Sequence, residues 1–364
     1  MNLFSDKLRE LTPYVPGEQP RDGAYIKLNT NENPYPPSPK VFEAISEATS
    51  RLRLYPDPES TELRDAYAEL VGLQRENVFV GNGSDEVLAT AFQAFFEGKS
   101  NVLMPDITYS FYPVYCNMYN VKALEIPVRE DMTVDPHMYV DQSMDSNIDP
   151  NGKPLNSGVI IANPNAPTSI ALGLSDIEEI VKSNKDSVVL IDEAYVDFGG
   201  ESAVSLINRY NNLLVVSTLS KSRSLAGLRV GFAAGSPELI SAMDTVKNSF
   251  NSYPVDVLAQ KGARAALLDR EYFEETTAKI IKTREWTKEQ LLNLGFNVLE
   301  SKANFLFIEH RECQAKDIFQ TLKEKKILVR YFDKPRIDNY LRVTIGTDEE
   351  MEEFVRVLER MISN

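Results

Sequence analysis

Five short apolar runs, each followed directly by polar or glycine-rich residues, constrain the fold of this chain most. The runs span residues 78–80, 102–104, 159–161, 188–191 and 213–216, and stretches with helical periodicity lie between several of them. Continuous β-branched runs that alternate with helices are typical of a mostly parallel sheet covered by helices on both faces. The sequence therefore predicts an α/β fold. In such sheets ligands bind beyond the carboxyl ends of the strands, where these polar segments fall.

With 364 residues, the chain is long enough for a second, smaller domain beside the one that holds this pattern. Residues 11–39 are rich in proline, asparagine and glycine, which favours an extended arm. Beyond Phe250 the alternation gives way to long helical stretches and a few strands, as in an α+β domain. We expect an N-terminal arm (1–30) that packs with the small domain, a large domain (31–250) and a small C-terminal domain (251–364).

Charge and composition exclude several classes of partner. Lysine and arginine number 39 and aspartate and glutamate 54, a net charge of −15 that argues against nucleic acid or an anionic membrane. Cys116 and Cys313 form no CxxC motif, and His137 and His310 lack metal-ligand spacing, so we expect neither a metal site nor a disulfide framework. The first residues lack a signal-peptide pattern and no apolar stretch spans a bilayer, which favours a cytoplasmic protein.

The segment after the run 213–216 holds the first candidate for chemistry. Lys221 stands among hydroxyl-bearing residues, and Arg229 follows eight positions later with small residues between them. A lysine in apolar surroundings loses its proton more readily, as a Schiff-base amine must, and hydroxyls with a planar guanidinium suit a phosphate. Pyridoxal phosphate (PLP) chemistry combines these two requirements. A solvated basic loop is the alternative that this segment alone leaves equally open.

A glycine turn after the run 78–80 is a candidate phosphate site. Gly81-Asn82-Gly83-Ser84-Asp85-Glu86 leads from a strand into a helix, whose first backbone amides are free to bind an anion. An ordinary helix cap has the same composition. Glu86 stands where the dinucleotide fingerprint needs its third glycine, which disfavours a nicotinamide-dependent dehydrogenase.

Asp192 ends the very hydrophobic run 188–191, where a buried carboxylate is costly unless it meets a cation. A protonated pyridine nitrogen is such a cation and would make the ring an electron sink. A helix-capping or ion-paired aspartate is the competing interpretation. Tyr195 could reach the 3-hydroxyl of the ring and Tyr109 could stack on its face, although both could simply pack in the core.

With these motifs, the sequence resembles the fold-type I, class II PLP-dependent aminotransferases over essentially its whole length. The resemblance is carried by Pro13-Tyr14, the arm residues 28–33, Tyr55-Pro56, Gly83–Glu86, Tyr109, Asn163–Thr168, Asp192–Tyr195, Ser220-Lys221, Arg229 and 341–347. Within the family, the arm, Tyr55-Pro56 and residues 225–229 look most like the members that act on histidinol phosphate.

The resemblance implies specific roles for these residues. Lys221 would form the Schiff base with PLP and act as the general base, Asp192 would pair with the pyridine nitrogen and Tyr195 with the 3-oxygen, while Tyr109 would stack on the ring. The phosphate would meet the amides of Ser84 and Asp85, the hydroxyl of Ser220, Arg229 and, from the other subunit of a homodimer, Tyr55. The resemblance offers four candidates for the substrate phosphate or the glutamate carboxylate: Tyr14, Asn31, Arg330 and Arg342.

One motif departs from the family. The usual Asn-Pro-Thr-Gly is here Ala166-Pro167-Thr168-Ser169. Either the asparagine that binds the 3-oxygen is displaced to Asn165, which is our prediction, or the bond rests on Tyr195 alone. Arg330 also has an alternative role, an ion pair with Asp333.

The expected reaction is transamination between L-histidinol phosphate and 2-oxoglutarate, which gives imidazole acetol phosphate and L-glutamate in histidine biosynthesis. Two other activities fit the same site: aromatic amino acid transamination and decarboxylation of threonine phosphate. A PLP-sensing transcription regulator would need a DNA-binding domain, for which the chain has no room.

Overall fold

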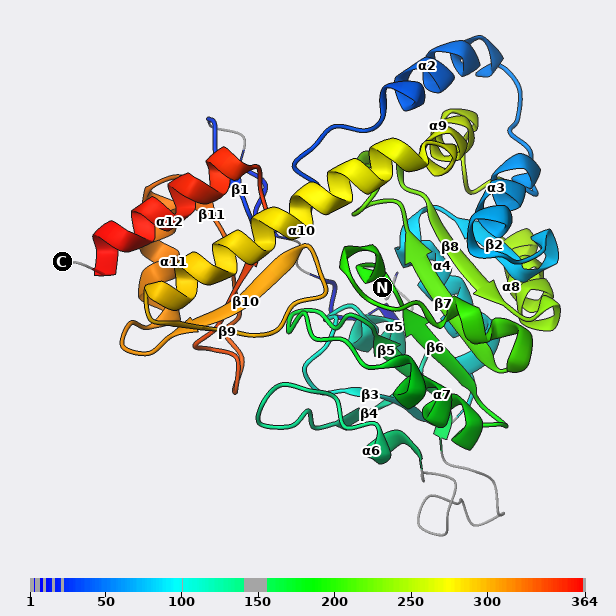
Figure 1. Cartoon of the computed structure of the whole chain (residues 1–364). Coiled ribbons are helices and arrows are strands. Elements are labelled where there is room, and N and C mark those ends of the chain that lie inside the picture. The colour runs from blue at the N-terminus through cyan, green and yellow to red at the C-terminus, as the bar shows by residue number, and fades with distance from the viewer. Residues whose placement is uncertain are drawn as a thin grey trace.

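Two lobes joined by the long helix α10 (Arg270–Asn293) make up this protein in a computed structural model (Figure 1). The structure describes residues 3, 7–8, 11–14, 17–20, 23–99, 101–140 and 156–362. The larger lobe contains the green and cyan strands of Figure 1, and the smaller one contains the C-terminal helices. The predicted helical stretch 270–294 is present as α10.

A seven-stranded sheet lies at the centre of the larger lobe, in the order β2-β8-β7-β6-β5-β3-β4. Its strands are β2 (Val78–Gly81), β3 (Asn101–Pro105), β4 (Lys122–Ile126), β5 (Asn156–Ala162), β6 (Val188–Asp192), β7 (Leu213–Thr218) and β8 (Gly231–Gly235). Only β8 runs antiparallel to its neighbours, β2 and β7. The mostly parallel α/β fold predicted from the apolar runs is confirmed.

Both faces of the central strands are buried, which explains why the interior positions of β6 and β7 are apolar on both sides of the sheet. Leu213 and Val215 belong to one hydrophobic cluster, whereas the intervening Leu214 and Val216 belong to the other. The first cluster includes residues of α3 (Thr61–Val71), α7 (Leu174–Ser183) and α9 (Val257–Leu268). The second includes residues of α4 (Gly83–Ala91), α5 (Tyr112–Met118) and α8 (Pro237–Phe250).

The smaller lobe is an antiparallel sheet covered by two helices. Its strands follow the order β12 (Arg330–Tyr331), β13 (Leu341–Thr344), β10 (Phe305–His310) and β9 (Phe296–Val298). Helices α11 (Ala315–Glu324) and α12 (Asp348–Ile362) pack with α10 on this sheet through a third hydrophobic cluster. The arm joins this lobe, because β1 (Ile26–Lys27) pairs in parallel with β11 (Ile327–Leu328).

The packing of α9 bears on where the lobes divide. Ala259 and Ala263 of α9 belong to the same hydrophobic cluster as Leu63 of α3 and Val41 of α2 (Pro39–Ala48). Residues 257–268 therefore pack with the larger lobe, and α10 is the element that passes from one lobe to the other (Figure 1). The boundary predicted at residue 250, where the alternation of apolar runs and helices ends, lies before α9. We place the boundary at the start of α10 instead.

Candidate active site

A cavity of about 1010 Å³ opens between the two lobes, beyond the carboxyl ends of β6 and β7. Twelve of the fourteen residues predicted to form a site line it: Tyr14, Asn31, Ser84, Asp85, Tyr109, Asp192, Tyr195, Ser220, Lys221, Arg229, Arg330 and Arg342. They come from the arm, five segments of the larger lobe and two strands of the smaller lobe. Because the strands of a parallel sheet end at one edge, motifs far apart in sequence meet there.

Lys221 enters the cavity three residues after the end of β7. Its Nζ lies 3.4 Å from the carbonyl oxygen of Thr30 and 5.7 Å from the centre of the Tyr195 ring. Asn33 Nδ2 donates to the Lys221 carbonyl at 3.0 Å, which holds the lysine backbone against the arm. No carboxylate of the described residues forms an ion pair with this ammonium group. Lys221 is thus an amine without an ion-pair partner among the described residues, beyond the carboxyl end of the central strand β7.

The start of α4 and the end of the 218–229 segment form an anion cradle. Ser84 and Asp85 lie in the first turn of α4, where backbone amides have no partner within the helix. Arg229 Nη2 contacts Asp85 Oδ2 at 2.9 Å. A Cβ at Gly231 would lie 2.5 Å from Ser84 N, and a Cβ at Gly83 would collide with the Arg229 guanidinium group. Only glycine therefore lets β8 and Arg229 approach the helix start so closely.

Ser220 adds a hydroxyl to this cradle. Its Oγ accepts a hydrogen bond from Thr218 Oγ1 at 2.9 Å, so its own proton is free for another acceptor. Among the described residues no protein atom takes that proton. Backbone amides, a hydroxyl and a guanidinium group around one space are the donor set that a phosphate monoester needs.

Asp192 is a buried carboxylate at the end of β6, 5% exposed. Burial raises the pKa of Asp192 to about 6, although the Tyr112 hydroxyl and the Ala194 amide donate to it at 2.8 and 3.2 Å and oppose the shift. Neither donor carries a charge, and within the described chain no basic side chain pairs with this carboxylate. The Lys221 charge acts on Asp192 from a distance and lowers its pKa slightly, but no described cation contacts the carboxylate; a protonated pyridine nitrogen would supply one.

Two tyrosines flank this carboxylate in the cavity. The Tyr195 hydroxyl accepts a hydrogen bond from Asn31 Nδ2 at 2.9 Å, and its ring meets Phe305 edge-on at 5.0 Å between centroids. The Tyr109 hydroxyl donates to Asp85 Oδ1 at 3.3 Å. Burial, with a smaller effect of the Asp85 charge, raises the pKa of Tyr109, so this phenol stays neutral.

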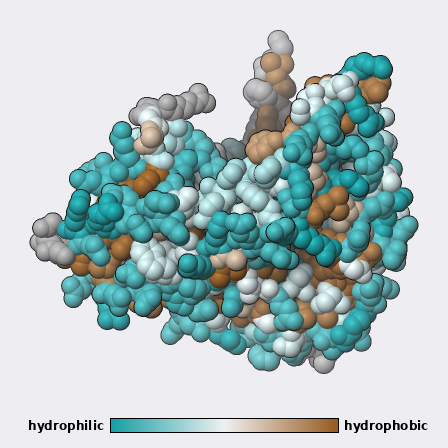
Figure 2. Space-filling model, turned by 45° about the horizontal axis from the view of Figure 1, so that its top comes forward, coloured by the Kyte–Doolittle hydropathy of each residue, from teal (hydrophilic) through white to brown (hydrophobic). Residues whose placement is uncertain are grey.

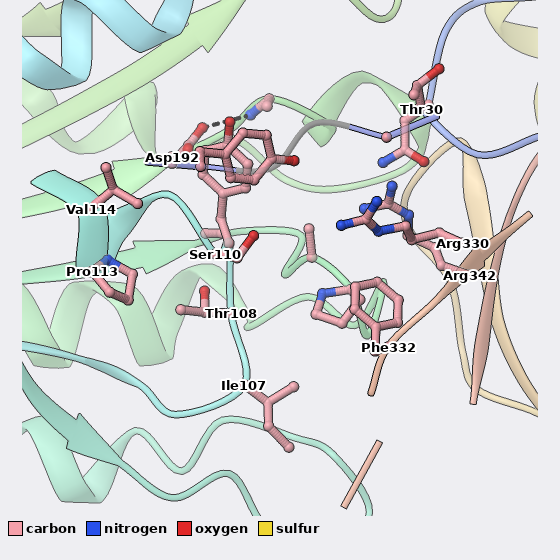
Figure 3. Close-up of a pocket in the computed structure, with 18 of the residues that line it drawn as sticks. Thr30, Ile107, Thr108, Ser110, Pro113, Val114, Asp192, Arg330, Phe332 and Arg342 are labelled. Carbon is pink, nitrogen blue, oxygen red and sulfur yellow. Dashed lines mark hydrogen bonds between the residues drawn. The ribbon is translucent and has the colours of Figure 1, made fainter. Parts of the chain in front are cut away.

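Arg330 and Arg342 form the opposite wall of the cavity, on the smaller lobe. They are direct cross-strand partners in β12 and β13, and Figure 3 shows their guanidinium groups side by side, between Thr30 and Phe332. Arg342 Nη2 donates to the Asn29 carbonyl at 2.9 Å, its Nε has no partner, and burial lowers its pKa. The alternative ion pair between Arg330 and Asp333 does not form, and no other described carboxylate pairs with either arginine. Like charges directly opposite are destabilising, and an anion bound between them would relieve this.

Asn165 is not brought into this cavity. Its Nδ2 donates to the Ile107 carbonyl at 2.9 Å and to Thr168 Oγ1 at 3.0 Å, and its Oδ1 accepts from Thr108 Oγ1 at 2.9 Å. It lines a second cavity of about 350 Å³ behind the loop, whereas Ala166 lines the first. The geometry therefore does not support Asn165 as a cofactor ligand, because the protein already occupies its amide, and the second alternative, Tyr195 alone, fits better.

Tyr55 also lies outside the cavity. It is 84% exposed and stacks on Tyr253 with 4.9 Å between ring centroids. An exposed tyrosine next to a second aromatic ring is compatible with a role in a neighbouring subunit, and that role stays a prediction.

Two residues that touch the predicted site were missed. Asn33, which holds the Lys221 backbone, stands in the same asparagine-rich arm motif, so its composition was a usable signal. Tyr112, which donates to Asp192, belongs to no recognisable motif. The contact joins residues 80 positions apart, so no local pattern could reveal it. In the part of the chain that the structure describes, no helix is long and apolar enough to cross a membrane, and no cluster of three metal-ligating side chains occurs.

Comparisons with known proteins identify the family of the chain. Residues 24–358 match the family model of aminotransferase class I and II. The chain is 56% identical over 362 residues to a histidinol-phosphate aminotransferase of Clostridium acetobutylicum, which covers 99% of both chains. It is 50% identical over 365 residues to the histidinol-phosphate aminotransferase of Brachyspira hyodysenteriae, which covers 100% of this chain and 99% of the relative.

Solved structures show the same fold at lower identity. The histidinol-phosphate aminotransferase of Sinorhizobium meliloti, solved in complex with pyridoxal-5'-phosphate, superposes with a TM-score of 0.88 at 22% identity, over 100% of this chain and 98% of its own. A histidinol-phosphate aminotransferase structure from Clostridium acetobutylicum gives a TM-score of 0.84 at 23% identity, over 93% and 99% of the two chains.

Proposed function

The chain belongs to the class I and II aminotransferases, and from this premise we propose that it transfers an amino group between L-histidinol phosphate and 2-oxoglutarate. The products are imidazole acetol phosphate and L-glutamate, a step of histidine biosynthesis. Full-length relatives at 50–56% identity have this activity in their names. The observation that carries the proposal is the arginine pair 330/342, which has no carboxylate partner among the described residues and faces the same cavity as Lys221.

The enzyme depends on pyridoxal phosphate, and the described residues fit this group. The amides of Ser84 and Asp85, the Ser220 hydroxyl and Arg229 would hold its phosphate. The Asp192 carboxylate, which pairs with no basic side chain among the described residues, would take the pyridine nitrogen, whose positive charge would give it a direct ionic partner. When bound, the cofactor supplies an aldehyde for amines and a ring that accepts the electrons left as a proton departs.

Tyr195 and Tyr109 complete the cofactor wall. The Tyr195 hydroxyl would meet the 3-oxygen, and the Tyr109 ring would cover one face of the pyridine. With Ala166 in place of an asparagine, the loop 163–169 brings no amide side chain to this part of the cavity. These roles are proposals that rest on which residues line the cavity.

Lys221 has the position of the base in the reaction. Among the described residues its Nζ donates a hydrogen bond only to the Thr30 carbonyl, at 3.4 Å, so the amine can turn toward a bound substrate. A proton removed from the carbon that bears the substrate amine can reside on Nζ and return to a neighbouring carbon. The Thr30 carbonyl and the nearby Tyr195 ring orient the amine.

Arg330 and Arg342 would bind the anionic end of each substrate. A phosphate monoester carries close to two negative charges at neutral pH and a carboxylate carries one. The same pair can therefore serve the phosphate of histidinol phosphate and the carboxylate of glutamate in turn. Phe332 and Phe305 lie against these guanidinium groups and help to exclude water from the contact.

We also propose that the enzyme is a homodimer. Seven large apolar side chains are exposed on or next to α2, α8 and α9: Phe42, Leu52, Leu54, Tyr55, Phe250, Tyr253 and Leu268. In Figure 2 apolar residues lie among polar ones at the upper right of the view, on the side where α2 lies in Figure 1. Apolar side chains gathered in this way are typical of a protein interface, and a second copy would bring Tyr55 to the neighbouring phosphate cradle. The cytoplasmic location stays a prediction.

A spectrophotometric assay tests the activity. Purified enzyme with 2-oxoglutarate should convert histidinol phosphate much faster than phenylalanine, and it should release no carbon dioxide from threonine phosphate. Faster turnover of phenylalanine would replace the proposal with aromatic amino acid transamination. Carbon dioxide release would replace it with the lyase reaction.

A further inference from the structure

The arm residue Asn31 contacts Tyr195 in a way that the roles above do not use. Asn31 is 1% exposed and has a left-handed backbone with φ of 56°. Asparagine tolerates this region better than most residues, but a single asparagine there still costs conformational energy. From this position its side chain reaches across from the smaller lobe to Tyr195 of the larger lobe. Of the hydrogen bonds that hold Asn31 in this conformation, the one to Tyr195 reaches the candidate active site.

The hydrogen bonds determine which way the Asn31 amide faces. Thr344 Oγ1 accepts from the Asn31 backbone N–H at 3.0 Å and so has its own proton left, which it donates to Asn31 Oδ1 at 3.0 Å. The oxygen of the amide is thus on the Thr344 side. Its Nδ2, which can only donate, lies 2.9 Å from the Tyr195 hydroxyl.

This direction leaves the Tyr195 proton available. A hydroxyl that accepts from Asn31 has its own hydrogen to donate elsewhere, and among the described residues no atom accepts it. Tyr195 lines the cavity, where Ala166 offers only a methyl group and Asn165 is turned away. The hydrogen-bond donation of Tyr195 into this part of the cavity therefore depends on the Asn31 contact.

We infer that Asn31 is a positioning residue whose amide makes the Tyr195 hydroxyl a donor into the cavity, toward the phenol oxygen of bound pyridoxal phosphate. Asn31 acts through Tyr195, and not as a ligand of the substrate anion. The inference rests on the proposed cofactor site. It assigns to the arm an effect on the electronic state of the cofactor, in addition to packing.

The expected signature is a shift in the pH dependence of the cofactor absorbance. The phenol oxygen of Lys221-bound pyridoxal phosphate shares a proton with the lysine nitrogen. A hydrogen bond from Tyr195 draws electron density from that oxygen and weakens its hold on the proton, so the pH midpoint of the absorbance change is kept low. Loss of the donor raises the midpoint, by about one pH unit for one hydrogen bond.

The experiment is a double-mutant cycle on the holoenzyme, read by absorbance against pH. Asn31→Gly keeps the left-handed backbone accessible and removes the amide. It should raise the midpoint by about 0.5–1 pH unit, and Tyr195→Phe should raise it at least as much. The double variant should match Tyr195→Phe alone. An unchanged midpoint in Asn31→Gly, or additive shifts in the double variant, would overturn the inference.

Three further variants separate positioning from structure. Asn304 Nδ2 donates to the Asn31 carbonyl at 3.1 Å without touching the amide, so Asn304→Ala should lower the Tm and leave the midpoint unchanged. A midpoint shift in Asn304→Ala equal to that of Asn31→Gly would reduce Asn31 to a structural role. If Asn31→Gly does not fold, Thr344→Val takes its place, because it removes the hydroxyl that holds the Asn31 amide. Thr344→Val should raise the pH midpoint by a smaller amount, and Thr344→Ser, which keeps the hydroxyl, should leave the midpoint unchanged. Equal midpoints in these two variants would contradict the inference. A wild-type protein without pyridoxal absorbance would instead refute the proposed cofactor site.

Discussion

The two walls of the cavity differ in how their charged side chains are paired. On the larger lobe, Arg229 forms an ion pair with Asp85, and two neutral donors, Tyr112 and Ala194, hold the Asp192 carboxylate. On the smaller lobe, Arg330 and Arg342 face each other across two strands without a carboxylate partner among the described residues. The first wall is arranged for a group that stays bound, and the second leaves positive charge for anions that arrive and leave. Variants of the first wall should therefore affect both substrates equally, and variants of the second should distinguish them.

Lys221→Ala should have the largest effect. It removes the amine that holds the cofactor and the base that moves the proton, so turnover should fall by at least ~10³-fold with both substrates. Single-turnover absorbance changes follow each half-reaction separately. Borohydride reduction followed by peptide mapping should label Lys221 in the wild type. A label on another lysine would remove Lys221 from the cofactor wall.

Asp192→Asn should cost on the order of 10³-fold in rate, if the electron sink depends on a protonated ring. Both half-reactions should slow together, because the cofactor is common to them. Near-normal turnover in a folded variant would show that the charge of Asp192 is not needed.

The same substitution should stabilise the protein without cofactor. The pKa of Asp192 is raised from 3.8 to about 6, so the folded state holds a proton that the unfolded state releases. Stability from this group is therefore present below pH 4 and is lost as the pH rises to about 6. At pH 7.5 the apo form of Asp192→Asn should be more stable by on the order of 2 kcal/mol, measured by urea unfolding. A stability difference between the wild type and Asp192→Asn that is the same at pH 4 and pH 7.5 would contradict a costly buried carboxylate.

Arg330→Ala tests the second wall. Removal of a guanidinium group from a desolvated phosphate should cost ~2–4 kcal/mol, which raises KM for histidinol phosphate by roughly 30-fold or more. The glutamate half-reaction should suffer less, because a carboxylate carries one charge and Arg342 remains. Lys326→Ala, on the same lobe but outside the cavity, is the matched control. Equal losses for both substrates would mean that Arg330 is structural or shared.

Tyr55→Phe should have the smallest effect of the four sites, about 5-fold if one hydrogen bond to the cofactor phosphate is lost. Mixed with Lys221→Ala subunits, it should form dimers in which both defects fall in one site and the other is wild type. Mixed samples should then exceed the activity of both parents. If they never do, Tyr55 does not act across an interface and the first wall belongs to one chain.

The sequence determined the positions of the chemistry along the sheet. Lys221, Asp192 and the Ser84-Asp85 turn each follow an apolar run, and strand ends can be located from local periodicity alone. The extent of α10 and α12 was readable for the same reason, since helical periodicity is a property of neighbouring residues. The carboxyl ends of parallel strands lie at the same edge of a sheet. Local strand assignments were therefore enough to predict that these residues lie close together.

Only the tertiary structure decided which side chains face the cavity once they are there. Asn165 and Ala166 are neighbours in the sequence, yet only Ala166 lines the cavity. The side-chain amide of Asn165 is hydrogen-bonded to Ile107, Thr108 and Thr168 instead. The contact of Asn31 with Tyr195 joins residues 164 positions apart, and that of Thr344 with Asn31 spans 313. No local pattern encodes such distances, because the direction of a side-chain amide follows from the donors and acceptors that the completed fold places around it.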